Sequence, residues 1–207
     1  MMTEKNQLIL RSGITLGAFA FVGVVLLVAV QWFTKDQIIE NERQTRLQRL
    51  QEVVPASLYD NDMLATIQQQ SLALKGLGNV ANIYMAKQGD EVTATVYEVV
   101  STQGYSGPIN LVVAIDQQGV LTGVRVVSHK ETPGLGDKID TNKSDWILKF
   151  AGKSLENPSE SGWKVRKDGG EFDQFTGATV TPRAVVNAVR EVLKFQQARS
   201  QQVAANE

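Results

Sequence analysis

The 207-residue chain contains no cysteine and only one histidine, His129. The lack of cysteine excludes disulfides, thiol chemistry and cysteine-ligated zinc or iron–sulfur centres. A single histidine also excludes a histidine-rich metal site. If the protein takes part in redox chemistry, an organic cofactor must therefore carry the electrons.

The chain also lacks an excess of charge of either sign. It has 21 Lys and Arg residues against 22 Asp and Glu residues, with no polybasic run and no acidic tail. Residues 36–207 keep 18 of the basic and 21 of the acidic residues, since only Glu4, Lys5, Arg11 and Lys35 precede them. A weakly acidic segment does not attract a phosphate backbone, so nucleic-acid binding is excluded.

Charge is absent altogether from residues 13–33 (GITLGAFAFVGVVLLVAVQWF), where twelve side chains are Ile, Leu, Val or Phe. These favour membrane insertion by about −4 to −7 kcal/mol in sum, and a helix of this length crosses a bilayer core. A cleaved signal peptide is the alternative, but its apolar region is shorter and a small-residue cleavage site follows it. Here the run ends in Gln31, Trp32 and Phe33. The sequence predicts an uncleaved transmembrane helix.

Basic residues do not decide the orientation of this helix, because Lys5 and Arg11 precede it and Lys35 and Arg43 follow it. The shortness of the segment 1–12 favours a cytoplasmic N-terminus and export of the rest. Residues 34–55 have apolar side chains at helical spacing and end in a proline, which predicts a stalk helix. Residues 56–207 then form the exported domain.

Four strand-like runs follow, at residues 82–87, 91–100, 109–116 and 120–128, and short turn-rich links between them favour antiparallel neighbours. A short helix is expected at 145–150. A final helix should begin with Thr181 as N-cap and Pro182 as its first residue, with one apolar stripe formed by Val185, Val186, Val189, Val192 and Leu193. The predicted fold class is α+β: one N-terminal transmembrane helix, then an antiparallel-sheet domain with flanking helices.

Three segments of this domain are candidates for chemistry: residues 104–108 (GYSGP), 129–136 (HKETPGLG) and 173–182 (DQFTGATVTP). The first also reads as a turn between strands, the second as a surface loop, and the third as the start of a helix. In the third, hydroxyls lie beside free amide donors and the positive end of the helix dipole, where an anionic phosphate is stabilised. These considerations do not select among Thr176, Thr179 and Thr181.

The segments DGGEFDQFTGATVTPRAVVNAV, HKETPGLGDKI and GYSGPI resemble the FMN-binding domain of bacterial Rnf-type electron transport complexes. The length, the single N-terminal span and the order of the motifs are similar to those of the G subunits of these complexes, over nearly the whole chain. The C subunit of the sodium-pumping NADH:quinone oxidoreductase shares the domain but is typically longer.

The resemblance implies that FMN is covalently attached through a phosphoester to Thr179, the last threonine of the S/T-G-A-T element. It also implies that a flavin transferase with FAD as donor recognises this segment, including Asp173 six positions earlier. Gln174 stands where glycine is common. The further residues that it places at or near the flavin are Thr176, Gly177, Ala178, Thr181, Glu131, Thr132, Pro133, Gly134, Leu135 and Gly136.

The resemblance further implies the partners and the location. The chain would be the electron carrier of an ion-translocating complex in the bacterial inner membrane, with the FMN domain in the periplasm and the other membrane subunits as partners. No catalytic residue and no metal are expected.

Two other functions compete with this interpretation. A hydrolase would use Thr176 or Thr179 as nucleophile and His129 as base, but no supporting motif accompanies them. A membrane-anchored scaffold without a redox role would differ from the electron carrier in having no bound flavin.

Overall fold

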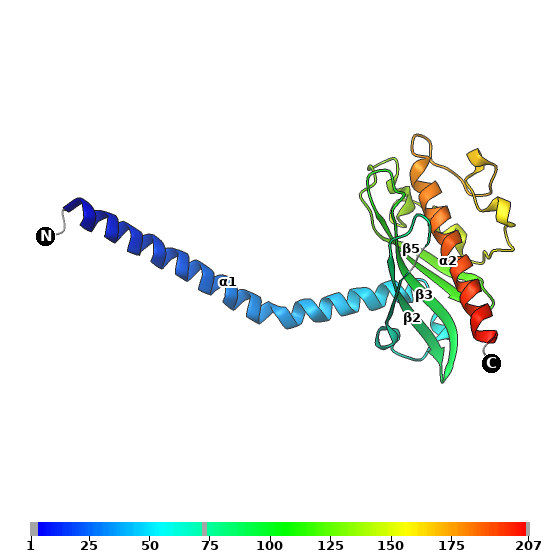
Figure 1. Cartoon of the computed structure of the whole chain (residues 1–207), viewed down its shortest axis with the longest axis horizontal. Coiled ribbons are helices and arrows are strands. Elements are labelled where there is room, and N and C mark those ends of the chain that lie inside the picture. The colour runs from blue at the N-terminus through cyan, green and yellow to red at the C-terminus, as the bar shows by residue number, and fades with distance from the viewer. Residues whose placement is uncertain (1–3, 72–73, 206–207) are drawn as a thin grey trace. The chain divides into compact units, whose positions relative to one another are not determined.

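The computed structural model describes residues 4–71 and 74–205 of the chain. Contacts divide the chain into two compact units, one that ends at Arg46 and one that begins at Leu47. The first unit is helical, and the second holds the sheet and the last helix (Figure 1).

Helix α1 (Glu4–Gln51) includes the whole uncharged stretch. Its large apolar side chains are exposed there: Phe19, Phe21, Trp32 and Phe33 are 70–77 % exposed. The most apolar window of the helix has a mean hydropathy of 2.6, and none of that window is buried. So much exposed apolar surface is unfavourable in water and is satisfied by a bilayer. The prediction of one N-terminal helix long and apolar enough to span a membrane is confirmed.

Past Phe33, α1 continues without a break as a polar helix. Side-chain hydrogen bonds one turn apart support it, from Gln37 to Asn41 at 3.1 Å and from Gln44 to Glu40 at 2.7 Å. The helix ends at Gln51, four positions before the predicted end of the stalk. The division into residues 1–12, 13–33, 34–55 and 56–207 stays a prediction.

The second unit is built on a five-stranded antiparallel sheet in which the strands pair in chain order. The strands are β1 (Gln68–Ser71), β2 (Val80–Gln88), β3 (Glu91–Ser101), β4 (Ile109–Asp116) and β5 (Leu121–Ser128). All four predicted strands are confirmed to within two residues. Strand β1 was missed because QQQS carries no apolar alternation, and its four side chains are exposed on the edge of the sheet.

One face of the sheet packs against α2 (Val180–Ala204), which lies across it in Figure 1. The predicted apolar stripe of this helix is buried, and it meets inward-facing side chains such as Tyr97, Leu111 and Val113. Next to it lies an aromatic group under the segment 145–178, formed by Trp146, Phe150, Trp163, Phe172 and Phe175. The short helix expected at 145–150 is the 3₁₀ helix η4 (Trp146–Phe150).

The opposite face packs against the residues that follow α1 and against the 3₁₀ helices η1 (Ala56–Leu58) and η2 (Met63–Thr66). Because side chains alternate along a strand, Val112 points to this face and Val113 to the other. The hydroxyl of Thr122 on β5 donates to the carbonyl of Val53 at 2.7 Å. Both faces of the sheet are therefore covered.

The antiparallel order brings three distant segments together. The end of β3, the start of β4 and the end of β5 lie at the same end of the sheet, as the pairs Ser101–Ile109 and Asn110–Ser128 show. The start of α2 lies there too, since the Ser101 hydroxyl donates to the Ala184 carbonyl at 3.4 Å. The segments 104–108, 129–136 and 173–182 consequently meet at one place.

A glycine in β5 permits the close approach of the chain after α1. A Cβ atom at Gly123 would lie 2.9 Å from both the Cα and the carbonyl oxygen of Val53, which is too short for real contacts. We expect Gly123→Ala to lower the free energy of unfolding by roughly 1–3 kcal/mol, the usual cost of overpacking. Chemical denaturation of the full chain in detergent measures this. The control is Gly78→Ala, where the added Cβ meets Val100 at an ordinary 3.4 Å; equal losses in the two variants would contradict the explanation.

Candidate functional site

A buried carboxylate joins the three converging segments. Glu131 is 4 % exposed and follows β5. Its Oε1 accepts a hydrogen bond from the backbone N–H of Ser106 at 3.0 Å, and its Oε2 accepts one from the hydroxyl of Thr181, which is 1 % exposed. The segment 129–136 is thereby held against both 104–108 and the first turn of α2.

Two glycines make room for this carboxylate. A Cβ on Gly136 would lie 2.8 Å from Thr181 Oγ1 and 3.1 Å from Glu131 Oε2, and one on Gly104 would lie 2.1 Å from the carbonyl oxygen of Gly107. Any side chain at these positions would push the hydrogen-bonded groups apart. The glycines of two predicted motifs are thus required by close packing around Glu131.

Within the segment 173–182, the chain forms a tight turn before α2. The N–H of Ala178 donates to the carbonyl of Phe175 at 3.1 Å, and Gly177, the third residue of the turn, has a φ of +82°. A type II turn needs a positive φ at this position, which glycine adopts without strain. The turn places Thr179 directly before the helix.

The predicted start of the last helix was wrong by two residues. Helix α2 begins at Val180, and the carbonyl of Thr179 accepts the first helical bond, from Arg183 N–H at 3.4 Å. Thr179 rather than Thr181 is therefore the N-cap residue, and Pro182 is the third helical residue. Proline is tolerated there because the first turn has no carbonyl partners for its N–H groups.

The three candidate threonines have different surroundings. Thr176 is exposed in the turn and lies outside the cavity described below. The Thr181 hydroxyl is buried and bonded to Glu131. Thr179 lines the cavity, and within the described part of the chain its hydroxyl has no hydrogen-bond partner. The structure thus separates three hydroxyls that the sequence alone could not.

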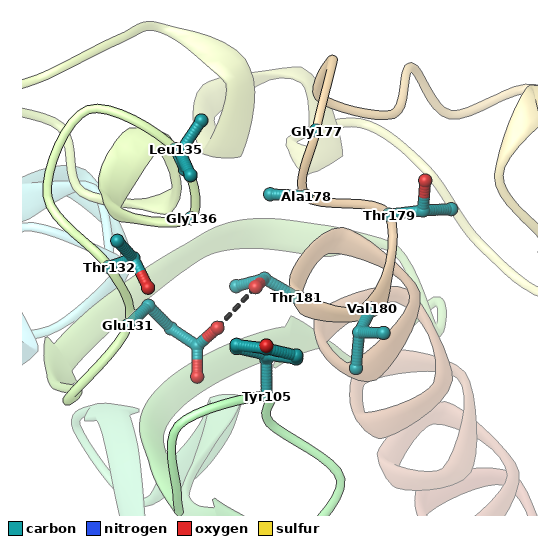
Figure 2. A pocket seen from close by; sticks show the side chains of 10 residues that line it. All are labelled: Tyr105, Glu131, Thr132, Leu135, Gly136, Gly177, Ala178, Thr179, Val180 and Thr181. Atoms are coloured by element: carbon teal, nitrogen blue, oxygen red, sulfur yellow. Dashed lines mark hydrogen bonds between the residues drawn. The ribbon is translucent and has the colours of Figure 1, made fainter.

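An open cavity of about 210 Å³ lies between the three segments (Figure 2). It is lined by Tyr105, Glu131, Thr132, Leu135, Gly136, Gly177, Ala178, Thr179, Val180 and Thr181. Figure 2 shows Glu131 and Thr181 pointing toward each other, Ala178 pointing toward the space between them and Leu135, and Thr179 pointing away from them. Thr179 is thus a residue of the cavity rim.

The residues present fit a flavin nucleotide. Leu135 and Ala178 supply apolar surface for a flat ring, and a phosphate at Thr179 would meet the N-terminus of a 25-residue helix. The N–H groups of Val180 and Thr181 have no hydrogen-bond partner among the described residues. The cavity is smaller than the 300–1,000 Å³ typical of enclosed ligand sites, so such a ligand would lie partly outside it.

Eight of the twelve predicted site residues line this cavity, together with Tyr105 and Val180, which were not predicted. Pro133 and Gly134 lie next to the lining residues, in an exposed part of the loop. Tyr105 belongs to the candidate segment 104–108, and its ring is 72 % exposed beside the cavity.

Asp173 does not line the cavity. Its Oδ2 is 2.9 Å from Lys149 Nζ and its Oδ1 is 3.1 Å from an Arg166 nitrogen, while its backbone carbonyl accepts from Trp146 Nε1 at 2.8 Å. The hydrogen bond from Lys149 lowers the pKa of the Asp173 carboxyl. Asp173 therefore holds in place the segment that leads into the turn at residues 175–178.

The hydrolase alternative finds no support in this geometry. His129 Nδ1 accepts the backbone N–H of Glu131 at 3.1 Å, and the imidazole does not line the cavity that holds Thr179. In the described residues, no three acidic or histidine side chains gather as a metal site would need.

An ion pair connects the 3₁₀ helix η6 (Arg166–Asp168) to the first turns of α2. Asp168 Oδ2 and Oδ1 accept from Arg183 at 2.7 and 2.9 Å, and this hydrogen bonding lowers the pKa of Asp168 from its ordinary 3.8. A carboxyl whose folded pKa is lowered stabilises the fold above its unfolded pKa, and the contribution is lost as the pH falls through the folded pKa.

The thermal midpoint of the parent should fall on acidification below pH 3.8, and we expect this fall to be smaller in Asp168→Asn. The reason is that the variant has no carboxylate to protonate at this ion pair. Thermal unfolding measured across the acid range checks this. Glu156→Gln, an exposed carboxyl outside the described ion pairs, is the control. An acid profile of Asp168→Asn identical to that of the parent would contradict the prediction.

Two family models match the chain. Residues 104–194 match the FMN-binding domain, and residues 1–53 match the RnfG N-terminal region. The G subunit of the ion-translocating oxidoreductase complex of Pseudomonas aeruginosa strain UCBPP-PA14 is 46 % identical over 208 residues, which cover 100 % of this chain and 97 % of the relative. The G subunit from Vibrio vulnificus strain YJ016 is 44 % identical over 193 residues, which cover 93 % of this chain and 92 % of the relative. The G subunit from Stutzerimonas stutzeri is 48 % identical over 181 residues, which cover 87 % of this chain and 77 % of the relative.

Proposed function

Because the chain belongs to the family of G subunits of ion-translocating oxidoreductase complexes, we propose that it carries electrons through an FMN that is covalently bound to Thr179 by a phosphoester. Family membership and the FMN-binding domain establish a member of a redox complex that binds FMN. The covalent bond, its position and the location of the domain are the further parts of the proposal.

The observation that carries the assignment to Thr179 is the contrast among the three threonine hydroxyls. The Thr181 hydroxyl is bonded to Glu131, and Thr176 lies outside the cavity. Thr179 is at the rim, directly before N–H groups of α2 that have no partner among the residues the structure describes. Those N–H groups and the helix dipole favour an anionic phosphate at this hydroxyl. A flavin transferase would need access to Thr179, and the rim position provides it.

A bound FMN supplies a ring that accepts and releases one or two electrons, and attachment through the phosphate leaves that ring unmodified. The residues of the cavity then orient the ring. Leu135, Ala178 and Val180 offer apolar contact, and Tyr105 offers an exposed aromatic face at the opening. No general base is needed for this role.

Replacement of Thr179 tests the attachment site. When the full chain is expressed together with a flavin transferase, we expect an intact mass increased by one FMN and a fluorescent band on a denaturing gel. Thr179→Ala should lose both because the acceptor hydroxyl is gone, whereas Thr179→Ser and Thr176→Ala should keep them. An adduct that persists in Thr179→Ala would reject the assignment. A parent chain without any adduct under these conditions would favour the anchored scaffold.

We also propose that the domain lies in the periplasm, that α1 anchors it in the inner membrane and that the other membrane subunits of the complex are its partners. Membership among the G subunits of ion-translocating oxidoreductase complexes supports the membrane anchor and the partner subunits. Since the chain has no cysteine, Gln118→Cys and Asn6→Cys each introduce a unique label site at an exposed position. In spheroplasts, a membrane-impermeant maleimide should label Gln118→Cys without lysis and Asn6→Cys only after lysis. The reverse pattern would place the domain in the cytoplasm.

A further inference from the structure

Glu131 has a feature that its packing role does not explain. Each carboxylate oxygen accepts a hydrogen bond, the pattern of an ionised group, but both donors are neutral: a backbone N–H and a hydroxyl. In the described part of the chain, no Lys or Arg forms an ion pair with it. A buried negative charge is therefore only partly compensated.

This charge lies in the wall of the cavity that would hold the flavin. Glu131 and Thr181 both line it, and their side chains face each other below Leu135 and Ala178 (Figure 2). Apolar neighbours reduce the screening by water, so the charge acts more strongly on the cavity than an exposed carboxylate would. Any added negative charge in the cavity is then disfavoured.

We propose that Glu131 lowers the reduction potential of the bound flavin and that the Thr181 hydroxyl limits this effect by donating to the carboxylate. The proposal rests on the proposed function, because it requires FMN in this cavity. An electron that enters the cavity brings negative charge close to Glu131, and repulsion makes the reduced state less stable. The hydrogen bond from Thr181 withdraws charge from Oε2 and weakens this repulsion.

The two residues therefore have opposite predicted effects. Glu131→Gln removes the charge and keeps the shape and an acceptor oxygen, so the midpoint potential should rise. Thr181→Val removes the donor, keeps the volume and leaves the charge less compensated, so the potential should fall. For Glu131→Gln we expect the ratio of reduced to oxidised flavin at a fixed potential to rise about tenfold. For a one-electron step this corresponds to a rise of about 59 mV in the midpoint potential.

Spectroelectrochemical titration of the flavin-loaded full chain in detergent measures these shifts. Thr181→Ser keeps the donor and should match the parent. Glu160→Gln should match it too, because that carboxylate is 73 % exposed and bonded to Lys194 at 2.7 Å. If the midpoint potentials of Glu131→Gln and Thr181→Val shift in the same direction, the cause is a general loss of structure and the proposal is overturned. An unchanged potential in both variants would also overturn it.

Two further readouts keep the test decisive. Thermal unfolding and the intact mass establish that each variant is folded and carries flavin. If Glu131→Gln does not fold, the comparison of Thr181→Val with Thr181→Ser decides alone: a lower potential only in the valine variant supports the proposal, and equal potentials overturn it. A parent chain without flavin on Thr179 would instead refute the proposed function, so the two failures are distinguishable.

Discussion

Glu131 accepts hydrogen bonds from Ser106, 25 residues earlier, and from Thr181, 50 residues later. Neither of these partners is near it in the chain, and the contacts exist only because the antiparallel order of the strands brings three loops to one end of the sheet. These hydrogen bonds in turn fix the positions of the three loops relative to one another. With the carboxylate buried, an unmade hydrogen bond would be costly, so the loop positions are specified rather than merely permitted. The cavity beside Thr179 has its shape for this reason.

Much of the fold follows from short-range patterns in the sequence. The strands β2 to β5 were predicted because buried faces demand alternating or continuous apolar side chains, and the stripe of α2 repeats with the helical period. Strand β1 is not predictable in this way, because an edge strand with exposed glutamines needs no apolar alternation. The helix start was misplaced for a related reason: Thr179 and Thr181 both suit an N-cap, and only the turn at Gly177 determines which of them precedes the first helical residue.

The site was predictable in its segments and less so in its interactions. The glycines, threonines and prolines of 104–108, 129–136 and 173–182 are visible as turns and as a helix start, and the resemblance to a known family adds the flavin. That Glu131 is the buried acceptor for both neighbouring segments leaves no local signature, because a glutamate in a loop is usually exposed. The absence of a side chain at Gly136 becomes meaningful only when Thr181 is known to lie 2.8 Å from the missing Cβ.

The size of the cavity and the proposed covalent bond explain each other. A cavity of about 210 Å³ is smaller than typical enclosed ligand sites, so burial alone would hold a flavin nucleotide weakly. A phosphoester at the rim removes the need for tight enclosure. The ring can then stay partly exposed beside Tyr105 and Leu135, where another protein of the complex can approach it closely enough to exchange electrons. A site that enclosed the ring more fully would hold it better but would separate it from its electron donor and acceptor, so the proposed attachment through Thr179 would reconcile retention with access.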